Sequence, residues 1–481
     1  MNSQSSDEAI QEASVSKYHL QEALRAGTLG TYRVNALFTR ISSDGDLEPE
    51  VGEPLPGAVA LHAHEYTHYL HNLSTIAGVM SLLSSFWLLL PFIKNADSNA
   101  RIQASSATGV DDDVASAFQV MNAMRGITRG IPNNHSWSNV LSWKFEPPTS
   151  VARQIIHSSE TLAQITVFSF KATAMFSSGH SLELEIQPGL DFITEGVAYE
   201  IERETRRLAG IPEEILDDQT PSYPYLIFRP LVDFLTGHQS SAEDRIVIGT
   251  LALLSHSPSE GLIRVCEVIR TEAEEGSNEG FGDYTNQLLN HFKNYSDHVI
   301  ESQLATIASI LSGSEVLSTG ASVYCQLIRT ALVKRQEYPV MEAAFIKSKM
   351  DAGGFLQRSL RMLERQVCQE KNWSANVISW IGLPGSVADQ PDETLQAFSI
   401  LQSAIHYVQQ HFTTDSIVPT AQLRDTPCPF SGACETQVEK NFPTVCDTRP
   451  WEFQYSTDRA NVCFYEAAQI ALIKQPIAPS T

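Results

Sequence analysis

Apolar and polar residues follow each other along this chain mostly with the period of an α-helix. In the second half such patterns dominate, over residues 224–236, 243–254, 260–274, 284–311, 315–336, 339–368 and 393–412. In the first half the pattern predicts helices over 58–90, near 114–125, over 151–176 and over 190–208. A last helix is expected near 459–474. The chain should therefore be mainly helical.

Two short segments alternate with the period of a strand instead. Residues 31–42 are rich in β-branched and aromatic side chains, and residues 181–186 read SLELEI. The segments 43–57, 95–113 and 126–150 carry Pro, Gly, Asn or runs of acidic residues, so they are expected to be loops or irregular. The fold class that follows is mainly α (α+β), with a small β-sheet beside the helices.

The amino-acid composition limits the kinds of molecule that this protein is expected to bind. Of 481 residues, 33 are Lys or Arg and 56 are Asp or Glu, which gives a formal charge of −23. So acidic a surface repels phosphate backbones and anionic lipids, which argues against nucleic acid as a partner and leaves a basic peptide compatible. Residues 1–16 lack the features of a secretory signal, and seven cysteines are few. The expected location is the cytoplasm.

The segment 76–93 reads IAGVMSLLSSFWLLLPFI and is nearly long enough to span a membrane. It also carries Ser81, Ser84, Ser85 and Pro91, which favours a helix buried in the core of a soluble protein. A membrane-spanning helix stays open as the alternative.

The chemistry is concentrated in His64-Glu65-Tyr66-Thr67-His68. Two His residues four positions apart lie on one face of a helix, so both imidazoles can bind one Zn²⁺. Glu65 follows the first His and can accept a proton from the attacking water. The motif predicts His64 and His68 as zinc ligands and Glu65 as a general base.

A hydrolytic zinc site needs a third protein ligand. Downstream, residues 194–202 read TEGVAYEIE. HEYTH followed by this segment resembles the gluzincin group of zincin metallopeptidases, in which a later helix supplies a Glu ligand within an E-G-x-A pattern. The resemblance implies a zincin-like catalytic core, Glu195 as third ligand and zinc-dependent peptide hydrolysis. Where some gluzincins place an orienting Asp four residues after the ligand, this chain has Tyr199.

Several neighbouring residues keep open roles. Glu200 is the rival third ligand, but it lies about 140° around the helix from Glu195, where it would support the site or be solvated. His71 would touch substrate, support the site or occupy a polar helix position, and His62 points elsewhere. In gluzincins a Tyr or His often stabilises the oxyanion. By that resemblance Tyr223, Tyr225 or His238 would take this role, and spacing cannot choose among them.

Four of the seven cysteines fall within 36 residues near the C-terminal end: Cys428, Cys434, Cys446 and Cys463. They could bind a second, structural zinc, or an iron–sulfur cluster, or be buried thiols. No pair has the C-x2-C spacing that would decide the question.

The expected organisation is a disordered segment 1–16, a zincin-like catalytic domain over 17–240 with an insertion between its motifs, a helical domain over 241–412, and a Cys-containing segment over 413–481. The expected function is zinc-dependent hydrolysis of peptide bonds. Two alternatives remain, a catalytically degenerate zincin that binds peptides or acts as a scaffold, and an intramembrane metalloprotease.

Overall fold

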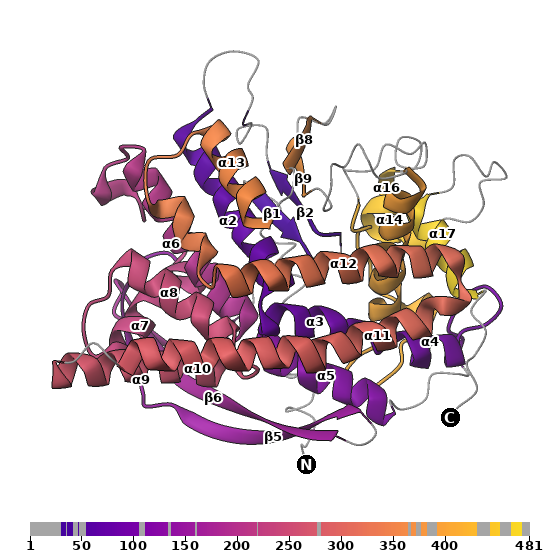
Figure 1. Ribbon diagram of the computed structural model, residues 1–481, viewed down its shortest axis with the longest axis horizontal. Helices are drawn as coiled ribbons and strands as arrows, with labels where there is room; N and C mark the ends of the chain where they lie inside the picture. The colour runs from indigo at the N-terminus through magenta and orange to yellow at the C-terminus, as the bar shows by residue number, and fades with distance from the viewer. Residues whose placement is uncertain are drawn as a thin grey trace.

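The computed structural model of the chain describes residues 30–34, 36–41, 47, 54–104, 111–132, 136–158, 161–218, 220–276, 280–363, 367–371, 377–381, 392–430, 443–452 and 463–473. Within this part of the chain, helices predominate and the strands are antiparallel, which confirms a mainly α (α+β) fold (Figure 1).

The helices are α2 (Pro56–Ser74), α3 (Ile76–Phe86), α4 (Leu89–Asn95), α5 (Asp112–Arg125), α6 (Leu190–Leu208), α7 (Phe228–Thr236), α8 (Ala242–Leu253), α9 (Pro258–Glu275), α10 (Gly280–Tyr295), α11 (Glu301–Ile310), α12 (Glu315–Glu337), α13 (Ala352–Leu363), α14 (Asp392–Gln410), α16 (Pro443–Thr448) and α17 (Phe464–Ile473). Short helical turns are η4 (Glu213–Ile215), η5 (Ser222–Leu226), η6 (Ser296–Ile300), η7 (Leu311–Gly313), η8 (Met341–Ile346), η10 (Thr420–Gln422) and η11 (Pro450–Glu452).

The strands form two antiparallel sheets. They are β1 (Gly30–Arg33), β2 (Phe38–Ile41), β3 (Ile127–Arg129), β4 (Val140–Phe145), β5 (Thr149–Ser158), β6 (Thr161–Phe176), β7 (Ser181–Gln187), β8 (Val367–Lys371) and β9 (Val377–Ile381). One sheet has the order β1-β2-β9-β8, and the other has the order β3-β7-β6-β4 with β5 on β6. The first sheet therefore joins segments more than 300 residues apart in sequence.

Four sequence predictions need correction. The described residues of the segment 151–176 lie in the long strands β5 and β6, not in a helix. Residues 31–42 form a hairpin rather than one strand, because the chain turns at Leu37, whose φ is +53°. The segment 126–150 is not wholly irregular, since β3 and β4 lie within it. Residues 339–368 contain η8, α13 and the start of β8 instead of one helix.

The expected helix 58–90 is also interrupted, at Thr75, where the backbone becomes extended (φ −113°, ψ 155°). The Thr75 hydroxyl donates to the carbonyl of His71 at 2.6 Å and accepts the amide of Gly78 at 3.1 Å, so it ends α2 and caps α3. An added Cβ on Gly78 would stand 2.1 Å from the His71 carbonyl oxygen. Glycine therefore lets α3 start directly against the end of α2.

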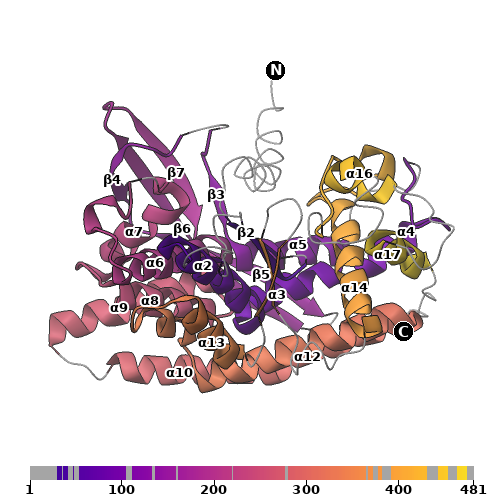
Figure 2. The ribbon, with the colours of Figure 1, turned by 90° about the horizontal axis from the view of Figure 1, so that it is seen from above.

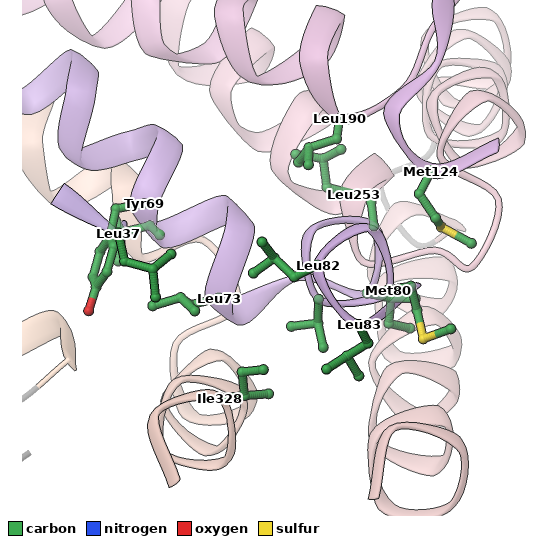
Figure 3. Packing of buried hydrophobic residues seen from close by; sticks show 14 of the residues in the cluster. Leu37, Tyr69, Leu73, Met80, Leu82, Leu83, Met124, Leu190, Leu253 and Ile328 are labelled. Atoms are coloured by element: carbon green, nitrogen blue, oxygen red, sulfur yellow. The ribbon is translucent and has the colours of Figure 1, made fainter. Parts of the chain in front are cut away.

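The apolar segment from Ile76 to Asn95 is long and hydrophobic enough to cross a membrane, and so is Glu315–Glu337. In the first segment, 83% of the most apolar window is buried inside the protein. Its residues pack into a continuous core that also includes Leu73, Met124 and Ile328 (Figure 3). This is the environment expected for a core helix.

Two helices of this core, α2 and α6, pack along each other (Figure 2). Helix α6 starts with Asp191 and ends with Arg206 and Arg207, charges that suit the dipole of a helix. An added Cβ on Gly196 would stand 2.2 Å from the Phe228 ring, so this glycine lets α7 approach α6 closely. The neighbour of Gly196 is thus a core side chain.

Candidate metal centre

Helices α2 and α6 bring the three expected ligands together. One oxygen of Glu195, Oε2, lies 3.6 Å from Nε2 of His64 and 3.6 Å from Nε2 of His68. Among the residues that the structure describes, these three side chains form the one group of potential ligands whose atoms all lie within 4.8 Å of one another. The two His of HExxH on α2 and a Glu 127 positions later on α6 thus meet at one point.

The distances suit zinc. In tetrahedral sites zinc lies about 2.0–2.2 Å from His nitrogen and carboxylate oxygen, so two such ligand atoms are about 3.4 Å apart. Oε2 of Glu195 is buried and has no hydrogen-bond partner within the described part of the chain. A buried carboxylate oxygen without a donor is costly, and a cation bound between the three side chains would remove that cost.

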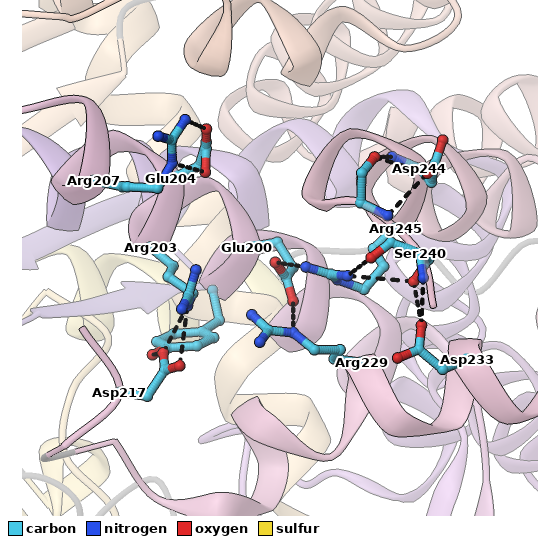
Figure 4. A network of polar contacts seen from close by, with 12 residues as sticks. Glu200, Arg203, Glu204, Arg207, Asp217, Arg229, Asp233, Ser240, Asp244 and Arg245 are labelled. Atoms are coloured by element: carbon cyan, nitrogen blue, oxygen red, sulfur yellow. Dashed lines mark hydrogen bonds and ion pairs between the residues drawn. The ribbon is translucent and has the colours of Figure 1, made fainter. Parts of the chain in front are cut away.

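Glu200 is directed away from this point, as the helical angle predicts. It is buried and accepts a hydrogen bond from Nη2 of Arg245 at 2.8 Å, and Nε of Arg229 lies 3.6 Å away (Figure 4). Glu200 is therefore neither the third ligand nor solvated, and its charge is offset by α7 and α8.

Glu202 contacts the ring nitrogen of His64 that faces away from Glu195. Its Oε2 lies 3.0 Å from Nδ1 of His64, while Nε2 of the same ring faces Glu195. A carboxylate on the outer nitrogen of a metal-binding His fixes the ring and its tautomer. Glu202 lies at the position where such a carboxylate would act, one turn further along α6 than Tyr199. Tyr199 instead donates to Asp217 at 2.5 Å.

The two His residues differ in charge. Burial lowers the pKa of His68 to about 4, so its ring is neutral at pH 7. Burial would lower the pKa of His64 too, but the Glu195 and Glu202 carboxylates outweigh it and raise that pKa to about 10. The Glu195 and Glu202 carboxylates thus favour positive charge at this point.

Glu65 lies beside the ligands on α2 with only 5% of its surface exposed. Burial raises its pKa to about 7, His64 lowers it, and the charges of Glu195 and Glu202 raise it further. Its carboxylate accepts a backbone hydrogen bond from Tyr32 on β1, whose ring lies parallel to that of His68 at 6.2 Å. A carboxylate with a pKa near neutrality is suited to take up and release a proton.

Of the three oxyanion candidates, the structure brings Tyr225 to the site. Its ring lies 5.9 Å from that of His64, and the charges of Glu195, then burial, then Glu65 and Glu202 raise its pKa. Tyr223 donates its hydroxyl to Thr128 at 2.7 Å, and His238 contacts the carbonyl of Thr236 at the end of α7.

The other two His residues of α2 are buried. His62 packs against the ring of Phe355 at 5.7 Å, as expected for a residue that points elsewhere. His71 has no exposed surface, and it contacts Thr194 and Glu342. His71 therefore neither touches substrate directly nor occupies a surface position.

The cysteine cluster is partly outside the described residues, because Cys434 lies there. The backbone amide of Cys428 donates to the carbonyl of Cys446 at 2.7 Å, which places these two residues side by side. The Sγ atom of Cys463 accepts the amide of Glu466 at the start of α17. A second metal at the four cysteines stays a prediction.

The comparisons add no family to this geometry: no model of a protein family, no curated protein and no solved structure matches the chain.

Sequence reasoning missed three residues that contact the site. Glu202 follows Glu195 by seven positions, which is two helical turns, so a count along α6 could have found it. Tyr32 and Glu342 come from distant segments, and no local pattern in the sequence links them to HExxH.

Proposed function

We propose that this protein is a zinc-dependent peptidase with a gluzincin-type site. The observation that carries the proposal is the convergence of Nε2 of His64, Nε2 of His68 and the unbonded Oε2 of Glu195, with the buried carboxylate of Glu65 beside them. Two His and one carboxylate, with one position left for water or substrate, form a donor set of hydrolytic zinc enzymes.

Zinc held by these ligands would polarise the substrate carbonyl and lower the pKa of the attacking water. Glu65 accepts one proton from that water as the new C–O bond forms. The same carboxyl then donates the proton to the leaving nitrogen as the C–N bond breaks, which gives a carboxylic acid and an amine. The second proton of the water then passes from the acid to the amine, so a carboxylate and an ammonium group result. The Tyr225 hydroxyl donates a hydrogen bond to the oxygen on which negative charge develops.

Peptide as the substrate class is supported by the resemblance of HEYTH and TEGVAYEIE to gluzincins, and the charge of −23 is compatible with basic peptides. The alternative of a degenerate zincin that only binds is disfavoured, because Glu65 is intact and its carboxylate is buried beside the expected ligands.

Cleavage in ¹⁸O-labelled water tests the proposal. Zinc-loaded protein is incubated with a mixture of unfolded polypeptides, and the fragments are analysed by mass spectrometry. The proposal predicts new carboxyl ends that carry ¹⁸O, formed at least roughly 10²-fold more slowly by the Glu65→Gln variant, because the amide cannot accept the proton. The variant should retain zinc, since Glu65 is not a ligand. Equal rates for both proteins would refute the assigned role of Glu65.

A further inference from the structure

A row of buried polar side chains crosses the interface between α2 and α6 next to the metal ligands. Nδ1 of His71 lies 2.9 Å from Oγ1 of Thr194, and Nε2 of His71 lies 3.2 Å from Oε1 of Glu342. His71 and Glu342 have no exposed surface and Thr194 has 2%. Thr194 directly precedes Glu195, and His71 lies three residues after His68.

The proton positions on His71 follow from the groups that its two ring nitrogens contact. Glu342 is ionised, because its burial is outweighed by Arg335 and His71, which hold its pKa well below the usual range. An ionised carboxylate only accepts, so Nε2 of His71 carries the proton. Burial lowers the pKa of His71, so the ring is neutral and its Nδ1 accepts the Thr194 hydroxyl.

Glu342 is itself anchored. Nη1 of Arg335 on α12 donates to Oε2 of Glu342 at 2.7 Å, and Nη2 donates to its other oxygen. The same guanidinium donates to Oγ of Ser74, at the end of α2, at 2.7 Å and to the carbonyl of Pro339 at 3.0 Å. The row therefore connects α2, α6, α12 and η8.

Such a buried array is an expensive way to hold helices together, because each buried ion loses its hydration. Unlike apolar packing, polar contacts constrain both the distance and the angle between the groups that they join. Here both ends lie next to metal ligands: the hydroxyl of Thr194 next to Glu195, and the imidazole of His71 one turn from His68.

We propose that Thr194 and His71 are positioning residues, held by Glu342 and Arg335, that set the separation of His68 and Glu195 and so the geometry of the bound metal. The inference rests on the metal site of the proposed function. It implies that η8 and α12 influence metal affinity, although neither element contributes a ligand.

The test removes one hydroxyl. Thr194→Val keeps the shape of the side chain but leaves Nδ1 of His71 without its donor. Zinc affinity, measured by competition with a chromophoric chelator, should fall about 10- to 100-fold, the usual effect of losing a residue that orients a ligand. The absorption spectrum of the Co²⁺-substituted protein should change as well. Thr194→Ser, which keeps the hydroxyl, should restore both.

Thr205→Val is the matched control, because Thr205 is equally buried on α6 and its hydroxyl has no hydrogen-bond partner among the described residues. It should leave zinc affinity and the Co²⁺ spectrum unchanged. If Thr194→Val does not fold, the paired variant Arg335→Met/Glu342→Gln gives the second measurement. It keeps an acceptor for His71 without the charged anchor, and the inference predicts weaker zinc binding and an altered Co²⁺ spectrum.

The possible failures are distinguishable. Parent protein that binds neither Zn²⁺ nor Co²⁺ would overturn the proposed function and this inference together. Parent protein that binds zinc tightly, with the same affinity and spectrum in a folded Thr194→Val or Arg335→Met/Glu342→Gln variant, would overturn the positioning role alone.

Discussion

Tyr223 and Tyr225 stand two residues apart in the same turn, but only Tyr225 has its ring against that of the proposed ligand His64. The Tyr223 hydroxyl is already bonded to Thr128, whereas the Tyr225 ring contacts His64. Tyr225→Phe should therefore lower kcat about 10²-fold, because a donor to the developing negative charge is lost. Zinc affinity should not change.

Tyr223→Phe is the matched control, and it removes a hydroxyl of the same kind outside the site. Steady-state kinetics on a peptide substrate, with zinc content measured in parallel, compare the two variants. A larger loss of kcat in Tyr223→Phe than in Tyr225→Phe would show that the oxyanion donor has been assigned to the wrong tyrosine.

The residues that sequence alone could place are those whose relation is local. His64, Glu65 and His68 follow from helical spacing, and the different directions of Glu195 and Glu200 follow from 100° per residue. The choice of Tyr225 and the contact of His71 with Glu342 depend on how distant segments pack. Sequence spacing carries no information about such contacts.

Among the secondary-structure elements, the junction of α2 and α3 depends on one glycine. Gly78→Ala places a Cβ 2.1 Å from a backbone oxygen and 2.5 Å from the Cα of Asn72, and backbone cannot move aside as a flexible side chain can. We expect a loss of about 3 kcal/mol in the free energy of unfolding, the upper range for overpacking.

Gly57→Ala provides the contrast, since this glycine lies in the first turn of α2 with nothing within 4 Å of an added Cβ. It should stabilise by about 0.5–1 kcal/mol, because alanine costs less conformational entropy in a helix. Urea unfolding of both variants measures the difference. Equal stability of the two would contradict the close approach of α3 to α2.

The ion pair between α12 and η8 predicts a dependence on pH. The pKa of Glu342 is lowered in the folded protein, so its contribution to stability is present above the ordinary Glu value of 4.5 and is lost as pH falls below it. In that window the unfolded chain binds a proton that folded Glu342 does not. Each pH unit should then cost up to about 1.4 kcal/mol from this group.

Urea unfolding at pH 6 and at pH 4 measures the effect. Other carboxylates contribute as well, so the comparison is with Arg335→Met/Glu342→Leu, which replaces the pair by apolar side chains. The parent should lose more stability than this variant between the two pH values. Equal losses would mean that Glu342 is not held ionised by Arg335.

The burial pattern of β6 explains why the segment 151–176 forms strands although its sequence pattern predicts a helix. In β6, Ile165 and Val167 are buried and Thr166 is more exposed. After a change of phase, Phe170, Ala172 and Ala174 are buried and Lys171 and Thr173 are more exposed, which is the period of a strand. The apolar residues are dense enough to fit a helical period too. Pairing with β5 and β7, through contacts such as Phe170 with Ile186, decides the outcome, and such pairing is not a local property.

At the scale of the whole molecule, the site draws on distant parts of the chain. The Tyr66 hydroxyl within HExxH donates to the carbonyl of Ser359 at 2.9 Å, and His71 contacts Glu342. Buried apolar residues from Ala36 to Leu472 form one continuous cluster among the described residues. The division at 240 and 412 stays a prediction, but α12 and α13, beyond residue 240, pack against α2, the helix that carries HExxH.

Locating zinc in the protein tests the proposed catalytic centre most directly. Crystals grown with zinc, with diffraction recorded on both sides of the zinc absorption edge, would place the ion by its anomalous signal. The peak should lie about 2.0–2.2 Å from Nε2 of His64, Nε2 of His68 and a carboxylate oxygen of Glu195. It should be absent from the His68→Ala variant. Full-occupancy zinc elsewhere, with no peak between these three side chains, would contradict the proposed catalytic centre.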